Sequence, residues 1–335
     1  MRILYVLDTY PSFSETFIAR EIAALRRRGH TIEVMALRPG DGERVIPIHR
    51  SSMRRLRMQV ERRVLGAPSA RSFQALGQAA WSAAIGEGAL RDIEHIHAGW
   101  ASHPAEIARG MAGLAGLSWS FSGHARDLFV EGGDLAGKLA SACFAACCTH
   151  AGVELLLSVA SESRSKVLFV PHGLPLAEFP FLESMPMDEI KLLSVGRLVE
   201  KKGYPILLEA LAQLARDGTR FSATVVGAGP LRRSLLAQRA RLGLDAVVHF
   251  PGAMPPEDVP MAMRDYNCLV SANVRAGDGD RDGLPNTIIE AAARGLPLVA
   301  SRVGAIEDFV DKQIGRLCPS GDAGALAAAI RARTR

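Results

Sequence analysis

Residues 2–37 are RILYVLDTYPSFSETFIAREIAALRRRGHTIEVMAL, an apolar run followed by an amphipathic segment and a second apolar run. The unbroken apolar run over residues 2–7 predicts a strand buried on both faces, which is typical of parallel sheets. A helix is predicted over residues 15–28, where Gly29 ends it, and a second strand over residues 31–37. This β-α-β order indicates an open, doubly wound parallel sheet.

The same alternation continues along the chain, with one interruption rich in proline. Further strands are predicted in the first half at residues 93–97, 118–121 and 166–170. After the Pro-rich segment, strands are predicted at residues 191–195, 222–226, 247–250, 267–271 and 297–301, with helices at 204–216, 229–242 and 286–294. We therefore predict an α/β protein with two Rossmann-like, doubly wound parallel-sheet domains, at residues 1–178 and 190–335, joined by a linker at 179–189. A ligand is expected in a cleft that the carboxyl ends of the strands face.

The composition is that of an ordinary globular protein, with 48% hydrophobic and 22% charged residues. The apolar run that ends before Asp8 is too short for a secretory leader or a membrane span, so a cytoplasmic protein is expected. Of the five cysteines, Cys143, Cys147 and Cys148 fall in an Ala-rich stretch that predicts a helix with an i, i+4 pair of buried thiols. Unpaired thiols agree with a reducing compartment.

Positive charge is concentrated in one segment, residues 50–63. It holds six arginines and one acid, and its net charge of +5 equals that of the whole chain. The arginines are Arg50, Arg54, Arg55, Arg57, Arg62 and Arg63. Apolar residues between them make the segment suitable for an anionic membrane surface, and a solvated helix face is the alternative. The mild overall charge gives no indication of nucleic-acid binding.

The most informative motif is GDGDRDGLPNTIIEAAARG, residues 277–295. Its turn leads into a helix, whose first N–H groups and positive dipole end suit a diphosphate. Leu284, Pro285, Asn286 and Thr287 form that turn and the start of the helix. Glu290, one turn further in, could accept hydrogen bonds from the two hydroxyls of a ribose. Helix capping by the Asp and Asn side chains is the alternative explanation.

The same motif partly matches two kinds of metal site. Asp278, Asp280 and Asp282 match the first half of a calcium loop, but position 12 is Ile289 where that loop needs a bidentate Glu. The pair Asp278 and Asp280 also resembles an Asp-x-Asp metal site. Because neither ligand set is complete, no metal is expected.

Two further motifs follow predicted strands of the second half. In SVGRLVEKKG, residues 194–203, Gly196 permits a tight turn, after which Arg197 and Lys202 could hold a diphosphate. In TVVGAGPLR, residues 224–232, Gly227 and Gly229 suggest a dinucleotide loop, but its third glycine falls at Arg232. That motif favours a glycine-rich turn beside a nucleotide rather than an NAD site.

In the first half, polar residues again follow strands. Ser12, Ser14 and Thr16 follow the first strand, and SGHARD, residues 122–127, follows another and directs His124 and Asp127 to the same edge. His95 and His97 have no third ligand nearby, so polarity at a strand end accounts for them better than a metal.

Together these motifs resemble glycosyltransferase family 4, the retaining transferases of GT-B fold. The resemblance covers nearly the whole chain and is densest in LLSVGRLVEKKGYPILLEAL, residues 192–211, and DGLPNTIIEAAARGLPLVASRVGAIEDFV, residues 282–310. YPSFSETFIAREIAAL, residues 10–25, and FSGHARDLF, residues 121–129, are similar to the subgroup that builds exopolysaccharide and colanic-acid repeat units.

The resemblance implies a UDP- or GDP-linked sugar donor, no other cofactor, and a glycan or polyprenyl-diphosphate-linked acceptor. It implies that Arg197 and Lys202 hold the diphosphate and that Glu290 holds the ribose. His124 would lie near the reacting sugar, and Gly227 to Gly229 would border the nucleoside. Asp282 would be the first acid of an E-x7-E motif and would contact the sugar, with a side chain one methylene shorter than that of the usual Glu.

Two other departures accompany the resemblance. Pro175 stands where the family usually has Asp, and the sequence ends at Arg335, before a helix that crosses back onto the first domain in relatives. Two alternative functions remain: a non-hydrolysing sugar-nucleotide epimerase and a catalytically silent carbohydrate-binding protein.

Overall fold

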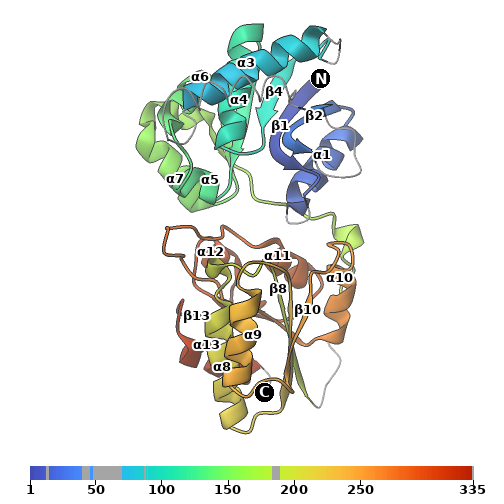
Figure 1. Ribbon diagram of the computed structural model, residues 1–335, viewed down its shortest axis with the longest axis vertical. Coiled ribbons are helices and arrows are strands. Elements are labelled where there is room, and N and C mark those ends of the chain that lie inside the picture. The colour runs from blue at the N-terminus through green and yellow to red at the C-terminus, as the bar shows by residue number, and fades with distance from the viewer. Residues whose placement is uncertain are drawn as a thin grey trace. The chain divides into compact units, whose positions relative to one another are not determined.

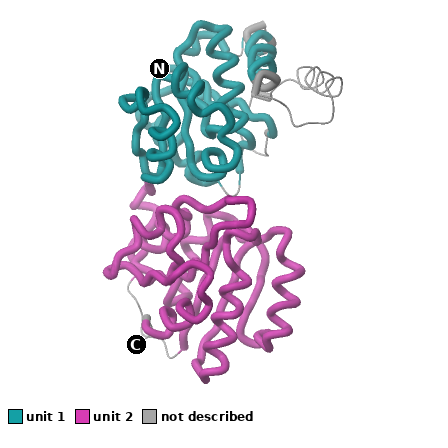
Figure 2. Tube along the Cα trace, turned by 90° about the vertical axis from the view of Figure 1, so that its left-hand side faces the viewer, with its two compact units in different colours: residues 1–171 teal, residues 172–335 magenta. Residues whose placement is uncertain are grey.

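A computed structural model describes residues 1–12, 15–39, 46–47, 70–86, 88, 90–182 and 189–333. Ser14 and the arginine-rich segment of residues 50–63 lie outside the described residues. The chain divides into two compact units, residues 1–171 and 172–335 (Figure 2). No helix in the described part of the chain is both long enough and apolar enough to cross a membrane.

Unit 1 is built on a seven-stranded parallel sheet in the order β3-β2-β1-β4-β5-β6-β7 (Figure 1). The strands are β1 (Arg2–Tyr10), β2 (Thr31–Pro39), β3 (Ile46–Pro47), β4 (His95–Ala98), β5 (Ser118–Gly123), β6 (Phe144–Cys147) and β7 (Val167–Phe169). The helices are α1 (Thr16–Arg27), α3 (Ala70–Gly86), α4 (His103–Ala115), α5 (Arg126–Phe129), α6 (Leu135–Ser141), α7 (His150–Val159) and the 3₁₀ helix η1 (Ser161–Lys166).

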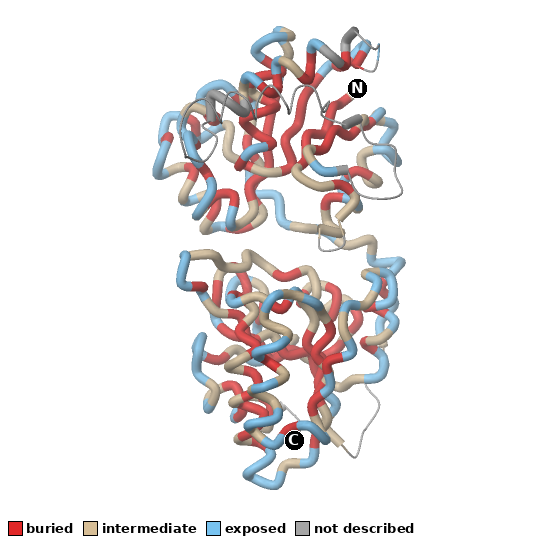
Figure 3. Tube along the Cα trace, in the orientation of Figure 1, coloured by how far each residue is buried: buried red, intermediate tan, exposed pale blue. Residues whose placement is uncertain are grey.

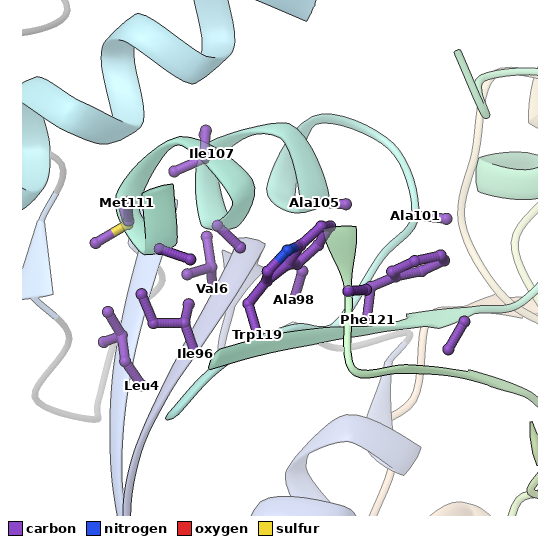
Figure 4. Packing of buried hydrophobic residues seen from close by; sticks show 14 of the residues in the cluster. Leu4, Val6, Ile96, Ala98, Ala101, Ala105, Ile107, Met111, Trp119 and Phe121 are labelled. Atoms are coloured by element: carbon purple, nitrogen blue, oxygen red, sulfur yellow. The ribbon is translucent and has the colours of Figure 1, made fainter. Parts of the chain in front are cut away.

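The sheet of unit 1 is buried on both faces, as the apolar run over residues 2–7 predicts. Leu4 and Val6 point into one hydrophobic cluster, whereas Tyr5 and Leu7 point into another. Figure 4 shows the first cluster, where side chains of β1, β4 and β5 meet those of α4. Each fully buried Leu or Ile of such a core contributes about 1.5–3 kcal/mol.

Unit 2 has a six-stranded parallel sheet in the order β10-β9-β8-β11-β12-β13. The strands are β8 (Ile190–Val195), β9 (Phe221–Val226), β10 (Val248–Gly252), β11 (Cys268–Ser271), β12 (Leu298–Ser301) and β13 (Gly315–Cys318). The helices are α8 (Tyr204–Arg216), α9 (Arg232–Arg241), α10 (Val259–Ala262), α11 (Asn286–Ala293), α12 (Ile306–Phe309) and α13 (Ala323–Arg333), with 3₁₀ turns η2 (Leu176–Glu178), η3 (Glu200–Lys202) and η4 (Met263–Asp265). Buried residues concentrate in the strands of each unit (Figure 3).

The two predicted parallel sheets are therefore confirmed, and α8 has the predicted bounds. The helix predicted for the Ala-rich stretch of residues 141–149 is wrong, because β6 occupies its centre. Cys147 is buried in that strand, while Cys143 is exposed and Cys148 partly exposed, so the three thiols form no buried helical pair. Ala has a high helix propensity, but pairing with β5 and β7 determines the local structure here.

The segment after residue 171 packs within unit 2. The N–H of Leu182 donates to the carbonyl of Arg294 at 2.8 Å, and His172 Nδ1 lies 3.3 Å from Asn286 Oδ1. The boundary between the units thus falls at residues 171/172, whereas the proline-rich sequence placed it at 178.

Candidate active site

In unit 2 the sheet order reverses at β8. The chain runs from β8 outward to β9 and β10, and then returns to the other side of β8 with β11. In doubly wound sheets a crevice opens at such a switch point, at the carboxyl ends of the strands. The turn after β8 and the loop after β11 both lie at this edge, and together with α11 they carry most of the predicted site residues.

The turn after β8 is held to the turn after β9 by backbone contacts. Leu198 donates its N–H to the Ala228 carbonyl at 2.8 Å and accepts from Leu231 at 3.1 Å. A Cβ on Gly227 would lie 1.9 Å from the Gly196 carbonyl oxygen, so a larger residue cannot occupy this position without moving the turn. The packing of the two turns explains why Gly227 is glycine, and its contact with a nucleoside stays a prediction.

Lys202 and Asp282 meet at this edge of the sheet. The Lys202 ammonium lies 2.7 Å from Asp282 Oδ2, and both side chains are largely buried. Arg197, directly after Gly196, is exposed. Gly196 contributes by being small, because a Cβ there would lie 3.0 Å from Lys202 Cε. Two of the predicted diphosphate ligands thus follow β8, one exposed and one already paired with an acid.

Asp282 has more partners than the sequence suggested. Lys201 lies 3.3 Å from its Oδ1, and the Asn273 amide donates to its Oδ2. Burial raises the pKa of the Asp282 carboxyl, but the ammonium groups of Lys202 and Lys201 outweigh it and hold the pKa below its ordinary value. Asp282 is therefore ionised at neutral pH.

Two of the three acids considered for a calcium loop, Asp280 and Asp282, are paired with lysine. Asp280 lies 3.1 Å from the Lys201 ammonium, which also contacts Asp282. A divalent cation would have to displace Lys201 from both carboxylates, so these donors do not form a ready metal site.

Helix α11 begins at Asn286, immediately after Pro285, at the same edge of the sheet. Its N-cap residue, Pro285, makes no capping hydrogen bond through its side chain, so backbone N–H groups of the first turn can face an anion. Leu284 packs beside the hydrophobic cluster under the helix, while Thr287 is partly exposed. Glu290, one turn inward, is 5% exposed. This placement suits the predicted diphosphate and ribose contacts, which stay predictions.

In unit 1, His124 follows β5 and its ring packs between two other aromatic rings. The ring centroids lie 4.6 Å from Trp100 and 4.8 Å from Phe17. Its Nε2 is 3.1 Å from the Gly99 carbonyl, so Nε2 carries the proton and donates. Burial lowers the pKa of His124 to about 4. His124 is thus neutral at pH 7, which does not favour a role as a cationic ligand of phosphate.

Asp127 and Lys138 hold the loops around His124. Asp127 Oδ1 accepts from the Ala125 N–H at 2.9 Å, and its Oδ2 accepts from the Ala101 N–H at 2.9 Å. The buried Lys138 ammonium donates to the Ala101 carbonyl at 2.7 Å and pairs with Glu106 at 2.9 Å. Asp127, predicted to point to the ligand, is used instead to fix the backbone.

His95 and His97 form a buried ladder with serines of β5. His95 Nδ1 and Nε2 lie 2.7 Å from Ser118 Oγ and Ser120 Oγ. His97 Nδ1 lies 2.8 Å from Ser120 Oγ, and its Nε2 lies 3.1 Å from Ser122 Oγ. Strand-end polarity is therefore the wrong account of these histidines, because they are hydrogen-bonded inside the sheet.

The structure therefore places the predicted residues in two groups. Unit 2 brings Gly196, Lys202, Asp282 and Gly227 into direct contact and places Arg197, Gly229, Leu284, Pro285, Asn286, Thr287 and Glu290 at the same end of the sheet. His124 belongs to unit 1. Sequence reasoning missed Lys201 and Asn273, although Lys201 stands beside Lys202 in a motif already singled out.

Comparison with known proteins identifies relatives of this chain. Residues 189–333 match the family model of the Glycosyl transferases group 1. The colanic acid biosynthesis glycosyltransferase WcaL of Escherichia coli is 33% identical over 171 residues, 50% of this chain but only 42% of that relative. WcaL of Salmonella typhimurium is 25% identical over 382 residues, covering 98% of this chain and 90% of that protein.

A solved structure supports the fold. Anabaena HepE in complex with UDP-glucose superposes with a TM-score of 0.73 at 18% identity, covering 99% of this chain and 89% of that one. Residues 189–333 thus form a domain of the group 1 glycosyltransferase type, and the two parallel sheets are those of the GT-B fold.

Proposed function

We propose that this chain transfers a sugar from a UDP- or GDP-linked donor to a glycan or polyprenyl-diphosphate-linked acceptor in surface polysaccharide biosynthesis. The observation that carries the proposal is the convergence of Arg197, Lys202 and the start of α11 at the carboxyl edge of one sheet. Two cations and a helix N-terminus at one edge suit a diphosphate. The relatives named for colanic acid biosynthesis support a role in polysaccharide biosynthesis.

The reaction we propose retains the configuration of the anomeric carbon. The bond between that carbon and the donor phosphate oxygen breaks, and a bond to the acceptor hydroxyl oxygen forms on the same face. The hydroxyl proton passes to the departing phosphate oxygen, so the products are a glycoside and a nucleoside diphosphate. Arg197 and Lys202 stabilise the charge that develops on the phosphate, which can lower the barrier by several kcal/mol.

We assign no step of the reaction to a metal ion. Asp280 and Asp282 are each paired with a lysine, which occupies carboxylate oxygens that a divalent cation would need. In this proposal the acceptor binds to unit 1. The arginines of residues 50–63 would bring the protein to the anionic membrane surface where a polyprenyl-linked acceptor resides.

The test is turnover of UDP- and GDP-sugars by the purified chain with a polyprenyl-diphosphate-linked glycan. We expect release of nucleoside diphosphate that depends on acceptor, with a product whose anomeric configuration, measured by NMR, equals that of the donor. Epimerised sugar nucleotide without acceptor would identify an epimerase. Binding without turnover of any donor would identify a silent carbohydrate-binding protein.

A further inference from the structure

Asp282 lies in a cluster of two carboxylates and two ammonium groups. Its carboxylate accepts from Lys201, Lys202 and Asn273. A carboxylate offers about four lone-pair positions, so three donors leave little capacity for the hydroxyls of a sugar. This differs from the sugar contact that the family resemblance implies for Asp282.

The loop that carries Asp282 is fixed to the 3₁₀ turn η3 residue by residue. Glu200 Oε1 accepts from the Gly277 N–H at 2.9 Å, and the Lys201 carbonyl accepts from the Val274 N–H at 2.9 Å. Gly203, with φ of +64°, approaches so closely that a Cβ would lie 1.9 Å from the Ala272 carbonyl oxygen. The position of Asp282 relative to Lys202 is therefore set by the backbone of both segments.

Lys202 is restrained at the distal end of its side chain. Its Cε lies against Gly196, where a Cβ would be 3.0 Å away, and its ammonium is held by Asp282 at 2.7 Å. A free lysine side chain has rotamer entropy that binding of a ligand must otherwise overcome. Asp282 uses one of the three ammonium N–H groups, so further donors remain on the same nitrogen.

We propose that Asp282 is a positioning residue, which acts by holding the Lys202 ammonium at the place where the donor diphosphate develops charge. Lys201 and Asp280 balance the charge of the cluster, so Asp282 stays ionised without a net charge in the crevice. This inference rests on the proposed function, because it assigns Asp282 a role toward the same diphosphate.

A double-mutant cycle between Asp282→Asn and Lys202→Met tests the proposal. We expect Asp282→Asn to lower kcat by about 10- to 100-fold in the wild-type background. In the Lys202→Met background it should change kcat by less than about two-fold, because two residues that act as a unit are not additive. Asp278→Asn is the matched control, since it removes the same charge from an exposed position of the same loop and should leave kcat unchanged.

If Asp282→Asn lowers kcat by the same factor in both backgrounds, Asp282 acts independently of Lys202 and the proposal is overturned. An unchanged kcat in Asp282→Asn would also overturn it. If Asp282→Asn fails to fold, the same cycle is run with Asp282→Glu. That change keeps the charge but lengthens the side chain, and its effect on kcat must likewise vanish without Lys202.

A second measurement needs no turnover, so it separates failure of this inference from failure of the proposed function. Acylation of Lys202 by an amine reagent, followed by mass spectrometry, should accelerate several-fold in Asp282→Asn and stay unchanged in Asp278→Asn. Equal labelling in all three proteins overturns the inference whatever the protein catalyses. Conversely, accelerated labelling without turnover of any donor sinks only the proposed function.

Discussion

The Ser120 hydroxyl oxygen lies 2.7 Å from Nε2 of His95 and 2.8 Å from Nδ1 of His97. A hydroxyl has one proton, so Ser120 donates to one ring and accepts from the other. Two neutral rings must therefore share the same tautomer. Protonation of both rings would leave the Ser120 proton without an acceptor and place two like charges together.

The ladder makes the protein sensitive to acid. Burial, with a smaller contribution from neighbouring histidines, lowers the pKa of His97 to about 3 from an ordinary value of 6.5. As the pH falls, the unfolded chain therefore binds a proton at His97 before the folded chain does. The contribution of the neutral ring to stability is fully present above pH 6.5 and is lost as the pH falls toward 3. At pH 4 the loss for His97 alone is roughly 3 kcal/mol.

Urea unfolding between pH 7 and pH 4 measures this loss. We expect the free energy of unfolding of the wild type to fall steeply as the pH is lowered. In His97→Gln the fall should be less steep, because one fewer proton is taken up on unfolding. The same slope in both proteins would contradict the assignment of a neutral, buried His97.

A second prediction concerns the diphosphate contacts. Arg197→Ala and Lys202→Met should each raise the barrier to transfer by about 2–4 kcal/mol, because each removes a cation that stabilises the transition state. Steady-state kinetics with saturating acceptor measures kcat directly. Arg233→Ala removes an exposed arginine of α9 and serves as control. Wild-type turnover in Arg197→Ala and Lys202→Met would end the assignment.

A third prediction concerns Glu290. Glu290→Gln should weaken binding of the bare nucleoside diphosphate by about 5- to 10-fold, since charge-assisted hydrogen bonds to the ribose become neutral ones. Calorimetry with UDP and GDP measures the affinity. A variant that binds as tightly as the wild type would remove Glu290 from the ribose site.

A fourth prediction concerns metals. EDTA should leave transfer unchanged, because Lys201 occupies the carboxylates that a divalent cation would need. The comparison is initial rates with and without chelator, followed by added magnesium or manganese. Activity that is lost with EDTA and restored by either ion would return Asp278 and Asp280 to consideration.

A fifth prediction comes from sequence alone. The chain should cosediment with anionic but not neutral liposomes at low salt, since each arginine near such a surface contributes about 1 kcal/mol. Screening at about 1 M salt should release it. Changing Arg54, Arg55 and Arg57 to Glu should abolish binding and preserve transfer to a soluble acceptor. Persistent binding of the triple variant would show that these arginines form only a solvated face.

Much of the fold could be predicted because buried parallel strands are unbroken apolar runs and glycine marks where helices end. The strand β6 was missed for a physical reason. Its sequence, Phe144–Cys147, is short and lies among alanines, and only pairing with β5 and β7 makes it a strand. Periodicity cannot distinguish so short an apolar run from part of a helix.

The sequence allowed us to predict those parts of the site that depend only on where a residue stands relative to a strand or a helix. Arg197 and Lys202 could be assigned to a strand end, and Glu290 to the first turns of a helix. The partners of Asp282 could not be predicted, because Lys201 and Asn273 reach it from two different segments. Nor does a sequence show that Asp127 turns its carboxylate to backbone N–H groups rather than to a ligand.

The contact of Gly227 with the Gly196 carbonyl also bears on how such chains can vary. The two glycines are 31 positions apart in the sequence. The backbone of Gly196 nevertheless occupies the space that a side chain at position 227 would need. The glycine-rich motif is therefore explained by the close packing of two turns, and it does not indicate dinucleotide binding. In a library that randomises both turns, glycine at 227 should survive selection for folding alone, even when no nucleotide is offered.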